Sequence, residues 1–301
     1  MLKTERNGVY WLVTQPDHGA VAGYMAAHWG NDQFAVPGGH SQAADPAELR
    51  AETVLAIAEH DNGWWEWEAA PKLSDVDHLP QDLREVLANQ SDGMDRWRRG
   101  VPRLGEHHPY ASLLISFHAY WLYAAKSEPG PAFLHPLFWN APPEKLFQGP
   151  LEQAREYVQE IAAMQGPYLA RLRQDRRTAS WLEAANLKPA VRLLQLLDGL
   201  SLYLCSPLIP AASGTSKGFG EDAIELLETP RRSWQDRVKI SVRPLGNRRI
   251  ALDPYPFDVD PLPVTVPVRI VDRAKVGRGP FSVWWRSEQP RWLEYELTAR
   301  A

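Results

Sequence analysis

Ionisable side chains interrupt the two most apolar helical stretches of the sequence. His118 lies in one of them, within residues 109–125, and Asp198 lies in the other. A lone buried carboxylate costs several kcal/mol, so Asp198 needs a partner. His60 and Asp61 are candidates, because they follow the apolar end of another predicted helix. A divalent metal ion satisfies carboxylates and neutral imidazoles together, so the sequence predicts a metal site.

Two of these residues also have structural interpretations. Asp198 could cap a bend at Gly199 or pair with Arg192, although the Leu-rich flanks on both sides argue against this. His118 could be a core imidazole that is hydrogen-bonded to a backbone carbonyl. Metal ligation and these interpretations stay open at this point.

The order of the residues resembles the HD-domain superfamily, and within it a bacterial branch of unknown function. The segments QPDHGAVAGYMAAHW, VLAIAEHDNGW and LLQLLDGLSLYL carry the resemblance, over roughly residues 10–205. The best-known members are metal-dependent phosphohydrolases. The resemblance implies one metal ion held by His18, His60, Asp61 and Asp198. Members with two metals add two histidines, for which the candidates are His118 and either His107 or His108.

The ligand types indicate the chemistry. A mixed His and carboxylate site suits Mn, Fe, Co, Ni, Mg or Zn, one ion or two, and the lack of thiolates argues against structural zinc. The first hypothesis is a hydrolase that cleaves a phosphoester of a small molecule or nucleotide with metal-bound hydroxide. The second is an HD-fold di-iron oxygenase of the myo-inositol oxygenase type. The third is a non-catalytic protein that binds a ligand in a Trp-lined cavity.

Residues near the doublet are candidates for catalysis and substrate binding. Asp61 is a catalytic candidate, and so is Asp17 beside His18, although capping its helix is the preferred interpretation of Asp17. In the HD-domain family small Gly-Lys type residues usually follow the His-Asp doublet, but here the chain continues with Asn62, Gly63, Trp64 and Trp65. The two tryptophans could form a wall of the substrate pocket or could simply pack in the core.

Cations and one loop histidine complete the predicted pocket. The cations available to stabilise a transition state are Arg50, Lys72, Arg96, Arg98 and Arg99. Arg99 is the one assigned to the substrate. His40 follows two glycines in a loop that could approach a ligand.

These residues need helices to position them. Apolar periodicity and capping signals predict helices at 17–29, 46–61 with Asp45 as N-cap, near 80–90, and at 109–125, 151–175 and 189–205. After about residue 230, RVKISVRPLGNRRIALD predicts a hairpin that turns at Gly246-Asn247. VTVPVRIVD, FSVWW and RWLEYEL predict further strands.

The expected fold is mainly α. An HD-like helical bundle would occupy residues 1–228, and a small antiparallel β module would occupy residues 229–301, with strand 8–14 able to join it. The β module has three candidate roles: a dimerisation surface that would give a homodimer, a lid, or a cover for the core.

Composition limits the class of protein. With 301 residues, 44% of them hydrophobic, the chain can bury a sizeable core. A formal net charge of -4 argues against general nucleic-acid binding and leaves a small-molecule substrate, phosphorylated or not. A single cysteine, Cys205, excludes an internal disulfide. The N-terminus lacks a secretion signal and no apolar run is long enough to span a membrane, so we expect a cytoplasmic protein without membrane contact.

Overall fold

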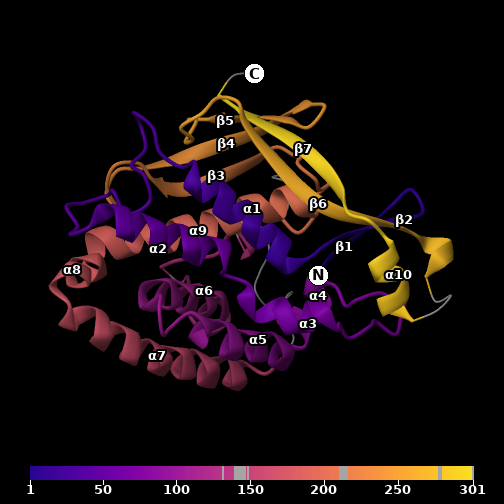
Figure 1. Ribbon diagram of the computed structural model, residues 1–301, viewed down its shortest axis with the longest axis horizontal. Coiled ribbons are helices and arrows are strands. Elements are labelled where there is room, and N and C mark those ends of the chain that lie inside the picture. Colours follow the sequence, from indigo (N-terminus) through magenta and orange to yellow (C-terminus); the bar gives the residue numbers. More distant parts are fainter. Residues whose placement is uncertain (131, 139–146, 148, 210–215, 277–279, 300–301) are drawn as a thin grey trace.

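The computed structural model describes residues 1–130, 132–138, 147, 149–209, 216–276 and 280–299 (Figure 1). The helices are α1 (Gln15–Ala27), α2 (Pro46–Ala58), α3 (Trp65–Ala69), α4 (Leu83–Ala88), α5 (Gln90–Arg103), α6 (Pro109–Ser127), α7 (Leu151–Gln174), α8 (Arg176–Ala179), α9 (Ala184–Cys205) and α10 (Phe281–Ser287). The strands are β1 (Leu2–Arg6), β2 (Val9–Val13), β3 (Ile224–Pro230), β4 (Arg237–Gly246), β5 (Arg249–Asp253), β6 (Leu262–Asp272) and β7 (Arg291–Thr298). Short 3₁₀ turns are η1 (Asn62–Trp64), η2 (Pro136–Phe138), η4 (Ser180–Leu182) and η5 (Arg273–Lys275).

The strands form one seven-stranded mixed sheet in the order β1-β2-β6-β7-β5-β4-β3. All neighbouring strands are antiparallel except β5 and β7, which are parallel. The sheet forms a whole layer along the upper side of Figure 1, with most helices below it. The prediction of a mainly α fold, an all-helical bundle with a small β module, is therefore wrong. Strand β2 lies within the predicted strand 8–14 and pairs with β6, more than 250 residues along the chain, as that expectation allowed. Strands β1 and β3 were not predicted and enlarge the sheet.

One of the predicted strands is also wrong. The hairpin β4–β5 is confirmed, and its turn places Gly246 and Asn247 at positive φ. FSVWW, however, lies in helix α10, where Phe281 stacks on Trp285 with ring centroids 5.3 Å apart. Residues four apart lie on the same side of a helix, so this short apolar run fits a helix as well as a strand.

The helices form layers beneath the sheet. Helices α1 and α9 pack against the sheet and against each other, α2 packs on α1, and α6 lies between α2 and α7 (Figure 1). The helices predicted at 17–29, 46–61, 109–125, 151–175 and 189–205 are confirmed, and the single helix expected near 80–90 is two, α4 and α5. One hydrophobic core joins side chains of these helices to the inner face of the sheet. None of the described helices is long and apolar enough to cross a membrane.

Helix α2 ends three residues earlier than expected. Asp45 is its N-cap, as predicted, and accepts a hydrogen bond from the backbone N–H of Glu48. The helix stops at Ala58, after which the chain turns into η1. His60 and Asp61 therefore lie in a turn beyond the helix, and their side chains need not point in helical directions.

Two glycines let α1 approach the end of α2. A Cβ atom at Gly19 would lie 2.9 Å from the carbonyl oxygen of Ala58, and one at Gly23 would lie 2.4 Å from the Ala58 Cβ. Only glycine fits at this distance. The close approach places His18 on α1 beside the turn that carries His60 and Asp61.

We expect Gly23→Ala to destabilise the protein. Alanine favours a helix over glycine by about 1 kcal/mol, but overpacking against Ala58 costs about 1 to 3 kcal/mol. Urea denaturation measures the net change in unfolding free energy. Ala58→Gly provides the second arm of a double-mutant cycle, because it removes the nearest of the Ala58 atoms that the new side chain at position 23 would meet, the Cβ, and leaves the Cα, which would lie 2.7 Å away. We therefore expect a partial recovery, and strictly additive changes would show that the contact with the Ala58 methyl group contributes nothing.

Candidate metal centre

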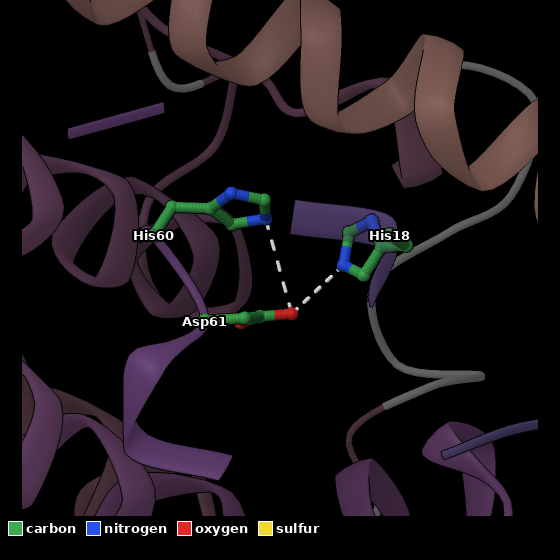
Figure 2. Close-up of side chains that lie close together, drawn as sticks. All are labelled: His18, His60 and Asp61. Carbon is green, nitrogen blue, oxygen red and sulfur yellow. Dashed lines mark hydrogen bonds and ion pairs between the residues drawn. The ribbon is translucent and has the colours of Figure 1, made fainter. Parts of the chain in front are cut away.

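Two helices and a turn bring imidazoles and carboxylates together in the interior. His18 lies in the first turns of α1, His60 and Asp61 follow α2, and Asp198 is in the middle of α9. All four side chains are buried. Figure 2 shows the rings of His18 and His60 approaching the Asp61 carboxylate from two sides. Residues far apart along the chain thus share one site.

The hydrogen bonds of His18 determine which of its nitrogens faces the cluster. The Ser201 hydroxyl donates its hydrogen to the backbone carbonyl of Asp198 at 2.8 Å. Ser201 Oγ can therefore only accept from His18 Nδ1, which lies 2.8 Å away. Nδ1 therefore faces Ser201, and Nε2 is the ring nitrogen that faces the cluster. That atom lies 2.9 Å from Asp61 Oδ2.

His60 has the same arrangement. Its Nδ1 donates to the backbone carbonyl of Ile57 at 2.8 Å, so Nε2 is the ring nitrogen that faces inward. Nε2 is buried and has no hydrogen-bond partner among the described residues. It lies 3.4 Å from Asp198 Oδ1 and 3.8 Å from Asp61 Oδ2. Two inward-facing imidazole nitrogens beside two carboxylates are the donor set of a metal ion.

His118 extends the cluster from α6. Its Nε2 lies 3.6 Å from Asp198 Oδ2, and its ring packs edge-on against His60 with centroids 5.2 Å apart. Its Nδ1 is buried without a hydrogen-bond partner in the described part of the chain. The structure therefore does not support the alternative of a core imidazole bonded to a carbonyl.

His135, which the sequence did not single out, also reaches Asp198. Its Nδ1 accepts from the backbone N–H of Leu137 at 3.1 Å, so Nε2 carries the proton and donates to Asp198 Oδ2 at 2.7 Å. This tautomer makes His135 a partner of the carboxylate, one that fixes its orientation, and leaves no lone pair on Nε2 for a metal. A Cβ atom at Gly199 would lie 2.7 Å from Pro136, so glycine at that position allows the segment to approach α9.

The electrostatics of the cluster favour a cation. Burial by itself would lower the pKa of His60, but the carboxylates of Asp198 and Asp61 outweigh it and raise that pKa to about 9. Burial lowers the pKa of His118 to about 3, so this ring is neutral at pH 7. For Asp198, the imidazoles of His60 and His135 overcome the effect of burial and hold the pKa well below its usual value. Two buried carboxylates thus remain ionised, and one divalent ion would balance both.

The residues fit a metal ion. Two overlapping sets bring one ligand atom of each member within 4.8 Å of the others: His18, His60 and Asp61, and then His60, His118 and Asp198. Ligands about 2.1 Å from a metal lie roughly 3 to 3.5 Å apart, so a modest adjustment would complete the coordination. The protein has a buried His/Asp cluster that could bind a metal ion.

A narrow pocket opens onto the cluster. The lining residues are Gln15, His18, Asp61, Trp64, Leu83, Leu87, Gly93, Trp97, His118, Leu122, Leu137, Asp198 and Leu202. Among the residues that the structure describes, no Lys or Arg side chain lines it. Gln15, another residue that the sequence did not indicate, has a buried Oε1 without a hydrogen-bond partner in the described part of the chain. The walls are apolar, and the polar groups lie at the cluster.

Several predicted site residues lie elsewhere. The N-cap of α1 is Thr14, not Asp17. The Thr14 hydroxyl donates a hydrogen bond to the Asp17 carboxylate at 2.6 Å. Asp17 lines a different pocket from the one at the metal cluster. His108 pairs with Glu52 at 2.6 Å, and His107 is exposed beside them. The expectation that His107 or His108 joins the cluster is wrong, because the buried Glu52 carboxylate takes the imidazole of His108.

Of the predicted substrate residues, only Trp64 lines the pocket. Trp65 is 42% exposed and lies under Arg103. Arg99 lines a separate surface pocket. His40 is buried in the loop before α2 and is absent from the pocket wall. These three residues therefore do not line the pocket at the metal cluster, and their predicted contact with a substrate stays a prediction.

The comparisons with known proteins give a family without a reaction. A family model described as "Protein of unknown function (DUF3891)" matches residues 1–273, and the chain belongs to this family. The match includes every residue of the cluster. No curated protein and no solved structure matches the chain.

Proposed function

We propose that this protein is a metal-dependent hydrolase that cleaves a phosphoester of a small molecule. The observation that carries the proposal is the pair of Nε2 atoms, on His18 and His60, that face the carboxylates of Asp61 and Asp198. The order of these residues along the chain is that of the HD type. Mixed nitrogen and oxygen donors suit Mn, Fe, Co, Ni, Mg or Zn, ions that also coordinate phosphate oxygens.

The residues of the chain would divide the work. A bound divalent ion would supply positive charge that lowers the pKa of a water molecule. Asp61 faces the pocket and is the group able to accept a proton from that water. Leucines and Trp97 would exclude bulk water and contact an apolar leaving group. His135 would hold Asp198 in place.

The test is hydrolysis of p-nitrophenyl phosphate and bis(p-nitrophenyl) phosphate with Mn, Ni, Co and Mg. We expect Asp61→Asn to lower kcat by about 100-fold or more, the range of general base catalysis. Asp17→Asn is the matched control, because this carboxylate is adjacent to His18 in sequence but faces away from the pocket. No activity on any phosphoester with any metal, or equal losses in the two variants, would contradict the proposal.

The shared ligand His60 favours one second candidate, a di-iron oxygenase. Because the two sets overlap at His60, a second metal could bind at His118 and Asp198. Two iron ions per chain, with a visible charge-transfer band, would support an oxygenase over a hydrolase. One metal ion per chain, without such a band, would exclude it.

A further inference from the structure

A second pocket, lined by residues of η1, α3 and α5 and by Lys72, gathers cationic side chains. It is lined by Gly63, Trp67, Lys72, Asp92, Asp95, Arg96 and Arg99, and holds about 580 Å³ including its open mouth. Lys72 and Arg99 are exposed, while Arg96 is 94% buried, since its exposed fraction is 6%. None of the three forms a salt bridge with another residue of the described ranges.

Burial lowers the pKa of the Arg96 guanidinium, and the charges of Asp92 and Glu68 only partly offset this effect, since neither carboxylate forms a salt bridge with it. The guanidinium lies 4.5 Å from the ring centroid of Trp64 and 4.8 Å from that of Trp67. Nη1 donates to the backbone carbonyl of Asp92, and Nε is buried without a hydrogen-bond partner in the described residues. A buried guanidinium with five N–H donors and so few acceptors is costly unless an anion completes it.

The two carboxylates in the pocket wall are already engaged. Asp95 pairs with Arg98 at 2.8 Å, and Asp92 accepts from the amide of Asn89 at 2.8 Å. Neither forms a salt bridge with Arg96. Three cations therefore face the pocket with an excess of positive charge over the acids that share it.

We propose that Lys72, Arg96 and Arg99 form a binding site for the phosphate group of a small molecule. Arg offers a planar fork of donors that matches phosphate oxygens, and Lys adds a point charge. The indoles of Trp64 and Trp67, which both contact the Arg96 guanidinium, would keep it oriented before the anion binds. The site is separate from the metal cluster, with which it shares a wall: Trp64 contacts Arg96 and also lines the metal pocket. It does not depend on the proposed hydrolase activity.

The test is isothermal titration calorimetry with inorganic pyrophosphate. We expect wild-type protein to bind it, and Lys72→Gln/Arg99→Gln to bind at least about tenfold more weakly, because two charge-assisted contacts are lost. Arg173→Gln/Arg176→Gln is the matched control, since it removes two exposed charges from α7 and α8 and should leave the affinity unchanged. No binding by wild-type protein, or equal binding by the Lys72/Arg99 variant, would overturn the proposal.

A second variant, Asp198→Asn, tests whether pyrophosphate binds at this site or at the metal cluster. Asp198→Asn removes a carboxylate of the cluster and leaves the cationic pocket intact. We expect pyrophosphate to bind this variant as it binds wild-type protein. If binding disappeared in Asp198→Asn, the anion would be held by the metal and the assignment to Lys72, Arg96 and Arg99 would be wrong.

Discussion

Protein with Asp198→Asn is expected to lose its metal. Asn keeps the shape of the side chain but removes one of the two buried negative charges that a divalent ion would balance. Loss of an outer partner of a metal ligand costs about 10- to 100-fold in affinity, and loss of a charged ligand should exceed the upper end of that range. Inductively coupled plasma mass spectrometry of the purified variant, beside wild-type protein, measures the metal content per chain.

Asp222→Asn is the matched control for this experiment. Asp222 is another buried carboxylate, and it accepts from the Ser216 hydroxyl and from the backbone N–H groups of Lys217 and Gly218. It lies outside the cluster, so its variant should keep the metal even where it lowers stability. Equal metal content in Asp198→Asn and wild-type protein would show that Asp198 is no ligand.

His135→Leu is expected to weaken metal binding by about 10- to 100-fold, the usual effect of losing a partner of a ligand. The leucine cannot donate the hydrogen bond that Asp198 Oδ2 receives at 2.7 Å, so the carboxylate loses its fixed orientation. Competition with a fluorescent chelator measures the affinity.

Two further variants separate positioning from loss of packing. His135→Gln retains an N–H donor and should recover part of the affinity, which a residue that only fills space would not do. His108→Leu breaks the contact with Glu52 and should leave the affinity unchanged. If His108→Leu lowered the affinity for the metal as much as His135→Leu does, the assignment of His135 as the partner of Asp198 would be wrong.

The sequence allowed the prediction that these histidines and aspartates come together, because a buried carboxylate needs partners. Asp198 is surrounded by leucines in the fully buried part of α9, residues 189–205, so an ionised carboxylate there must meet compensating groups. His60, Asp61 and His118 were the available groups, and the structure brings them to Asp198. The HD resemblance added His18, which periodicity alone did not distinguish from a surface residue.

Other features depend on tertiary contacts that no local pattern contains. His135 lies outside any predicted element, and it reaches Asp198 only because Pro136 packs on Gly199. His108 looked equivalent to a ligand until the position of Glu52 on α2 was known. The extent of the sheet was missed for the same reason, since β1 and β3 form its two edges through pairing with β2 and β4.

Anomalous diffraction at the absorption edge of the metal found in solution tests the central claim most directly. Crystals of the metal-loaded protein should show a peak bounded by Nε2 of His18, Nε2 of His60 and the carboxylates of Asp61 and Asp198, about 2.0 to 2.3 Å from each ligand atom. A second, weaker peak at His118 is compatible with the geometry. A metal-loaded crystal with its peaks elsewhere, and none among these side chains, would contradict the metal centre.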